Sequence, residues 1–186
     1  MRPLFTIHAG ELLVGEHIER HFRNLNVWVP SKDSGIDLLV TDKKNKRSIS
    51  LQVKYSRDFL VTHLPAEFQR PLRACGWWTF NPTKLSASSA DYWVLLLLGF
   101  AHRTTDYVII PPKELFRRLR KLHPEETGKA RLQTYLWTTM SNRCWETRNL
   151  KRPDHHKIAE GNFQSEIRDF SPFLNNWEAV KELNGK

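Results

Sequence analysis

Apolar and polar residues alternate along residues 48–55, and this period of two predicts a β-strand. Because side chains change sides at each strand residue, one face is apolar: Ile49, Leu51, Val53 and Tyr55. The other face is polar: Ser48, Ser50, Gln52 and Lys54. A short apolar run at residues 36–40 predicts a preceding strand, and the charged segment 41–47 between them predicts a turn. The two strands are therefore expected to form a hairpin.

A helical period predicts a helix that begins near Ala9 and extends toward residue 25. Its apolar stripe holds Val14, Ile18, Phe22 and Leu25. Glu11 falls in the middle of this stripe, whereas Glu16 points nearly the opposite way. A carboxylate on a core-facing stripe needs a partner, because burying a lone charge is costly. A metal, a lysine or free helical amides would serve, and a simple interaction with the helix dipole is the competing interpretation.

The remaining pattern predicts a mixed α/β (α+β) fold. Further strands are predicted at residues 26–30, 76–81, 92–100 and 106–112. A hairpin added to the core sheet is predicted at residues 132–140 and 144–147. Helices are predicted at residues 113–123, 165–170 and 176–183, and a charged loop at 151–156. The segment 92–100 is apolar on both faces, so it is expected to be a central strand covered by helices on both sides.

Composition narrows the class of protein. The 186 residues predict one domain, with a core at about 9–123 and a C-terminal extension at about 124–186. A net charge of +9 favours an acidic partner, most commonly nucleic acid. Cys75 and Cys144 lack metal-ligand spacing, which favours free thiols in a reducing cytoplasm. The longest apolar run is too short to cross a bilayer and no signal peptide is evident, so no membrane association is expected.

Three polar residues of the predicted hairpin have complementary chemistry. Asp37 follows Gly35 at the start of the first strand, and Gln52 and Lys54 project together from the second. A carboxylate and an amide oxygen suit Mg²⁺, while an ammonium can polarise a water or steady a phosphate charge. The hairpin is therefore a candidate divalent-metal and phosphate site.

The order helix, strand, aspartate, turn and strand with Gln52-Val53-Lys54 resembles the PD-(D/E)XK nuclease superfamily, which includes restriction endonucleases and Holliday-junction resolvases. Ile36-Asp37 stands for the family's proline-aspartate, and Gln52 for its second acid, as in branches with a QxK signature. Gly10-Glu11 also looks like the N-terminal GE helix of several branches. The resemblance is strongest over residues 9–60.

This resemblance implies a restriction endonuclease-like core and a metal-dependent DNA endonuclease of restriction or repair type. Mg²⁺, or Mn²⁺, would be held by Asp37, the Gln52 side chain and the Val53 carbonyl, with Glu11 completing the shell. Lys54 would orient the attacking water, so the implied catalytic residues are Glu11, Asp37, Gln52 and Lys54. A homodimer is expected for a double-strand cut, and no organic cofactor is expected.

Two other functions remain open: a weak or inactive nuclease-fold DNA-binding protein or subunit, and a nuclease that processes structured RNA. Candidate nucleic-acid contacts are Lys32, Lys43, Lys44, Arg57, Arg117 and Arg118, although a solvated surface explains such charges equally well. Trp77 and Trp78 are candidates for stacking on unpaired bases, but packing in the core is favoured. Asp33 is an alternative acid whose Ser/Gly-rich surroundings favour a turn.

Overall fold

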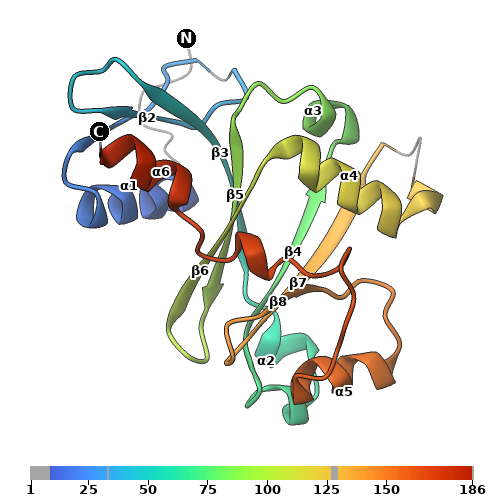
Figure 1. Ribbon diagram of the computed structural model, residues 1–186. Coiled ribbons are helices and arrows are strands. Elements are labelled where there is room, and N and C mark those ends of the chain that lie inside the picture. The colour runs from blue at the N-terminus through green and yellow to red at the C-terminus, as the bar shows by residue number, and fades with distance from the viewer. Residues whose placement is uncertain (1–8, 33, 127–129, 186) are drawn as a thin grey trace.

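The computed structural model, which describes residues 9–32, 34–126 and 130–185, is organised around a mixed five-stranded sheet (Figure 1). Its strands are β1 (Leu25–Trp28), β2 (Leu38–Asp42), β3 (Ser48–Arg57), β5 (Tyr92–Gly99) and β6 (Thr104–Ile110), in the order β1-β2-β3-β5-β6. The central pair β3 and β5 is parallel, and the other neighbours are antiparallel. The predicted hairpin is thus present as β2 and β3, and the predicted central strand as β5.

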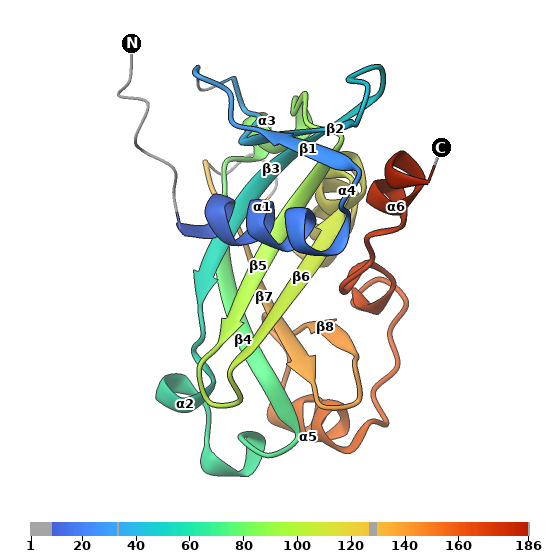
Figure 2. The ribbon, with the colours of Figure 1, turned by 90° about the vertical axis from the view of Figure 1, so that its left-hand side faces the viewer.

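Helix α1 (Ala9–His21) covers one face of this sheet, together with the short C-terminal helix α6 (Glu178–Asn184), as Figure 2 shows. The helix ends at His21, short of the predicted residue 25, and Leu25 begins β1. The residues of the predicted stripe are nevertheless buried, and they pack in one cluster with the apolar face of β3. Gly10 lets the helix approach closely, because a Cβ atom there would lie 3.0 Å from Cβ of Tyr55. This contact fixes the first turn of α1 against the strand that carries Gln52 and Lys54.

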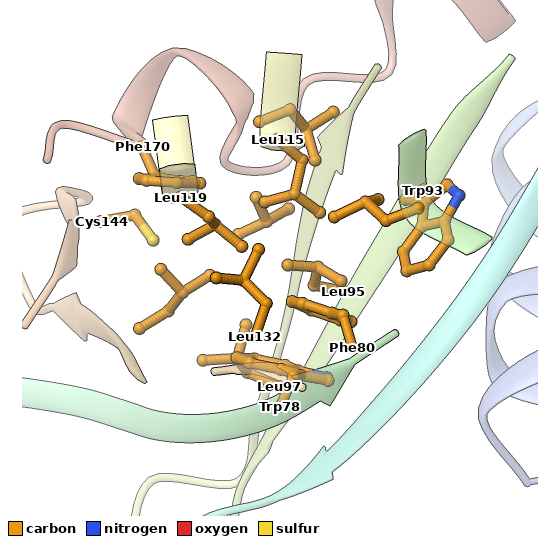
Figure 3. Close-up of a cluster of buried hydrophobic side chains, with 14 of the residues drawn as sticks. Trp78, Phe80, Trp93, Leu95, Leu97, Leu115, Leu119, Leu132, Cys144 and Phe170 are labelled. Carbon is orange, nitrogen blue, oxygen red and sulfur yellow. The ribbon is translucent and has the colours of Figure 1, made fainter. Parts of the chain in front are cut away.

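A second, three-stranded antiparallel sheet covers the other face, in the order β4-β7-β8. It consists of β4 (Leu72–Phe80), β7 (Leu132–Thr139) and β8 (Cys144–Glu146). Helices α3 (Pro82–Ser86) and α4 (Pro112–Leu122) flank it. The inner sides of both sheets share one core with α4 (Figure 3). The second face of β5 is therefore covered by a sheet as well as by a helix, not by helices alone.

The C-terminal hairpin pairs with β4 and does not extend the central sheet, so that prediction was wrong. The free edge of β6 is occupied by the chain end instead, because Asn175 donates its backbone N–H to the Tyr107 carbonyl (2.6 Å) and its Oδ1 accepts from the Tyr107 N–H (2.8 Å). The hairpin instead packs the inner side chains of β7 against those of β5 and β6. Leu132 and Leu136 are fully or almost fully buried there.

Residues 151–156 form the start of a helix, α5 (Arg152–Glu160), where a charged loop was predicted. Proline is compatible with the first turn of a helix, and Gly161 ends the helix in a left-handed conformation (φ 79°). Ile158 is buried beneath it, and His155 packs on Trp137 with ring centroids 4.6 Å apart. The charged segment 151–156 therefore belongs to an amphipathic helix and not to the predicted loop.

The other short elements are α2 (Leu60–His63) and 3₁₀ turns at Ala66–Phe68, Pro124–Glu126 and Ser171–Phe173. The helix predicted at 165–170 is replaced by turns, whereas the one predicted at 176–183 corresponds to α6. The buried carboxylate of Asp106 joins the C-terminal region to the core. It accepts from Arg73 Nε (2.8 Å), Thr138 Oγ1 (2.9 Å) and Asn175 Nδ2 (3.1 Å).

Both cysteines are free and buried, so we expect them to resist alkylation in the native protein. Burial, aided by the charge of Asp58, raises the pKa of Cys75 to about 12, and burial raises the pKa of Cys144 well above its ordinary value. Since the thiolate is the reactive form, the Cys75 shift alone reduces it about 1,000-fold at neutral pH. Iodoacetamide labelling followed by mass spectrometry should modify both residues in guanidinium chloride and neither within minutes in buffer. Rapid native labelling would contradict this packing.

Candidate active site

A cleft with a volume of about 1020 Å³ opens between the first turn of α1, the β1–β2 connection, β3 and the region of α3. Four of the residues that line it are the catalytic candidates Glu11, Asp37, Gln52 and Lys54. The fold brings them together because α1 is packed on β3 and because the β2–β3 hairpin places residues 37 and 52 side by side. Glu11 comes from α1, Asp37 from the segment before β2, and Gln52 and Lys54 from β3, and all four line this one cleft.

Asp37 caps the point at which β2 begins beside β3. Its N–H donates to the Leu51 carbonyl (2.8 Å), and its Oδ2 accepts the Val53 N–H (2.7 Å) and the Gln52 amide Nε2. Gly35, at φ 80°, adopts the left-handed conformation that the preceding turn requires. Because the N–H and C=O of one strand residue face the same edge, the Val53 carbonyl also faces this side of β3.

Gln52 and Lys54 project from the same side of β3 but differ in exposure. Gln52 is only 8% exposed, and its amide is held by Asp37. Lys54 is half-buried, with Nζ 5.7 Å from the centroid of the Trp93 ring. That ring is itself fixed, because Trp93 is buried and its Nε1 donates to Ser88 Oγ (2.9 Å). The contact with this ring therefore favours one position of the Lys54 ammonium at the cleft wall.

Glu11 lies in the first turn of α1, half-buried and in the cleft lining. The sequence placed it on the core stripe, and the structure places it where that stripe runs out into the cleft. Its position follows from the close packing of Gly10 on Val53 and Tyr55.

The donors in the cleft suit a hard cation that retains several waters. Within residues 9–32, 34–126 and 130–185, no group of three or more His, Cys, Asp or Glu side chains is arranged to hold a metal ion. Glu11 and Asp37 contribute two carboxylates to the cleft lining, Gln52 an amide and Val53 a backbone carbonyl, and Mg²⁺ commonly binds proteins through one or two carboxylates plus water. Gln52 now turns its NH₂ toward Asp37, so a half-turn of the amide is required to present its oxygen. With that rotation, the Asp37 carboxylate and the Gln52 amide would both offer oxygen atoms, the donor type that Mg²⁺ and Mn²⁺ prefer.

The predicted nucleic-acid contacts separate into two groups. Lys32 is exposed and lines the cleft. Lys84 lines it from α3 and was not among the predicted contacts, because its segment resembles a polar connector. The other candidates lie outside the cleft lining: Lys43, Lys44, Arg57, Arg117 and Arg118. Lys43 and Lys44 are exposed at the hairpin tip, and Arg57 is exposed at the end of β3. Asp33 lies outside the described residues.

Arg118 is used for packing within the chain. Its Nη1 donates to three carbonyls of the segment 166–169, each at 3.0 Å, and its Nε to Glu114 (2.7 Å). Arg117 donates to the same carboxylate, and the two arginines, Arg117 first, lower the pKa of Glu114 to about 2. His17 is likewise packed, against His21 and Trp177 with centroids 4.2 and 4.8 Å apart. These residues stabilise the fold and lie apart from the cleft.

Comparison of the chain with protein-family models, with curated proteins and with solved structures found no match. Among the described residues, no helix is both long and apolar enough to span a membrane. The fold and the cleft together define a mixed α/β protein with one solvent-open cavity, lined by a carboxylate from α1, a carboxylate from the segment before β2, and an amide and a lysine from β3 of the central sheet.

Proposed function

We propose that this protein is a metal-dependent endonuclease that hydrolyses phosphodiester bonds in DNA. The observation that supports this proposal is the convergence of Glu11, Asp37, Gln52 and Lys54 on one open cleft. Their order along helix, hairpin and strand is the one that resembles the PD-(D/E)XK superfamily. The charge of +9 and the lysines at residues 32, 54 and 84 in the cleft suit a polyanionic substrate.

In this mechanism, Asp37, the Gln52 amide oxygen and the Val53 carbonyl would hold Mg²⁺, and Glu11 would complete the shell directly or through a water. When bound, such a cation would supply a water of lowered pKa and offset charge on the phosphate. Lys54 donates a hydrogen bond to the attacking water or to a phosphate oxygen as negative charge builds. Lys32, from the β1–β2 connection, and Lys84, from α3, line the same cleft and would hold the DNA backbone there.

The proposed endonuclease would act in restriction or repair of DNA in the cytoplasm. A homodimer would place two such clefts on opposite strands of a duplex, since one site meets one strand.

The proposal is tested by incubating supercoiled plasmid, single-stranded DNA and branched DNA with the protein in Mg²⁺ or Mn²⁺. We expect metal-dependent cutting that EDTA abolishes and that Asp37→Ala lowers by at least about 100-fold, because the carboxylate holds both the cation and the edge of β3. Equal cutting by wild type and Asp37→Ala would assign the activity to another site or a contaminant. Cutting of structured RNA and not of DNA would select the RNA-processing function.

One contact favours a second candidate, a DNA-binding protein of nuclease fold with little activity. The Gln52 amide stands where an acid would bind a cation more strongly, and it donates to Asp37. DNA binding without metal, together with no cutting in any metal tested, would select this alternative.

A further inference from the structure

Three aromatic side chains form a surface cluster beside the cleft, which we call the aromatic ledge: Phe59, Trp77 and Tyr135. Trp77 is 45% exposed and Tyr135 is 36% exposed, which is unusual for rings of this size on paired strands. The Trp77 and Tyr135 rings meet edge to face with centroids 5.7 Å apart, and Phe59 lies 6.1 Å from Trp77. Such contacts hold the indole in a defined orientation while leaving much of it in solvent.

Phe59 packs against a buried cluster, whereas the Trp77 and Tyr135 rings of the ledge are exposed. Trp78 alternates to the inner side of β4 and is buried between the sheets, whereas Trp77 faces outward. Farther along the same outer face, Cys75 and Trp137 are buried in a cluster with Ile158 of α5. The cover stops before Trp77 and Tyr135, so this part of the sheet stays open.

The aromatic ledge and the cleft share strand β4, which carries Trp77 and also contributes to the cleft lining. Thr79 lies on the same face of β4 as Trp77 and also lines the cleft, and two strand residues span about 7 Å. The strand bearing Lys54 is tied to this part of β4, because Trp77 N–H donates to Ser56 Oγ (2.8 Å) and Trp78 Nε1 to the Lys54 carbonyl (3.0 Å). A DNA strand with its backbone over Lys54 and Lys84 would therefore run past the strand that carries Trp77.

We propose that the ledge stacks an unpaired base of a DNA strand bound in the cleft, so that the preferred substrate carries a single-stranded segment next to the cut. This inference rests on the proposed function. Stacking requires an exposed, rigid aromatic face beside a basic groove, and both are present here. A base inside an intact duplex has no free face to offer Trp77.

The test measures the affinity of the full-length protein for fluorescent oligonucleotides by anisotropy, in EDTA so that no cutting occurs. The probes are a single strand, a forked duplex and a blunt duplex of the same sequence. Trp77→Ala should weaken binding of the single strand and the fork about 5- to 100-fold and leave the blunt duplex within about twofold. Trp77→Phe should recover most of the affinity, since it keeps a stacking face.

Phe100→Ala is the matched control, because Phe100 is 59% exposed at the end of β5 and does not line the cleft. Thermal melting of each variant checks that it is folded. An equal loss on all three probes, or no loss on the single strand, would overturn the ledge, as would binding of a single-stranded RNA in place of DNA. If Trp77→Ala has no effect while wild type still cuts DNA in an Asp37-dependent manner, the ledge fails and the nuclease stands. If Trp77→Ala weakens binding of the single strand and the fork as expected and the wild type cuts no DNA, the base-stacking inference stands and the nuclease proposal fails.

Discussion

Replacing Lys54 with alanine is expected to lower the rate of DNA cleavage about 100- to 1,000-fold, the range found when a single charge-stabilising donor is removed from an active site. Lys54 lies in the cleft on β3, the strand that also carries Gln52, and its ammonium lies over the buried Trp93 ring. In the proposed reaction its ammonium would neutralise negative charge that is greatest in the transition state, so catalysis should be reduced more than binding. Single-turnover cleavage and anisotropy, measured on the same DNA, separate the two effects.

Lys113→Ala is the control for this loss, because Lys113 is an exposed lysine on α4 outside the cleft lining and carries the same charge. It should cut at the wild-type rate. If Lys54→Ala reduced affinity and rate by the same factor, Lys54 would be a phosphate anchor and not a catalytic residue. If it changed neither, the cleft would not be the site of cleavage.

The parts of the fold that could be predicted from sequence are those set by local periodicity. Alternation over residues 48–55 predicted β3, the apolar run predicted β5, and the stripe through Val14 and Ile18 predicted the buried face of α1. The hairpin placed Asp37 on the strand next to Gln52 and Lys54, but the register that sets Asp37 beside Gln52 is known only from the structure. The roles assigned to these residues remain predictions.

The parts that could not be predicted depend on contacts between distant segments. Local sequence does not determine whether the hairpin of β7 and β8 extends the central sheet or covers it; in the structure it pairs with β4, and Asn175 bonds to the edge of β6. Arg118 looked like an exposed basic residue because its partners lie about fifty positions away. Lys84 faces the cleft only because α3 folds across from β3.

Replacing Gln52 with glutamate is expected to make the stability of the protein depend on Mg²⁺. The change removes the hydrogen bond that Gln52 Nε2 donates to Asp37 and places two carboxylates together at a position only 8% exposed. Loss of a hydrogen bond to a charged group, with like-charge repulsion added, costs about 1.5–3 kcal/mol without metal. At this chain length that corresponds to a fall in Tm of about 3 to 12 °C.

Millimolar Mg²⁺ should restore much of this loss, because a cation bound between the two carboxylates stabilises the folded state by mass action. Differential scanning calorimetry with and without Mg²⁺ measures both effects. Gln69→Glu is the control, since Gln69 is half-buried on the turn after residues 66–68 and lies outside the cleft lining. A Gln52→Glu variant with the wild-type Tm in EDTA and no response to Mg²⁺ would mean that residues 37 and 52 do not share a cation.

The same variant distinguishes the two candidate functions. A charged ligand binds Mg²⁺ more strongly than a neutral amide, so Gln52→Glu should reach half-maximal cleavage at a metal concentration about tenfold lower if the wild type is a working nuclease. If wild type binds DNA without cutting it and the variant cuts, the amide is what keeps the site inactive. If the variant gains metal affinity and still does not cut, the cleft holds a cation and DNA without hydrolysing the strand, and the DNA-binding function is the better account of this site.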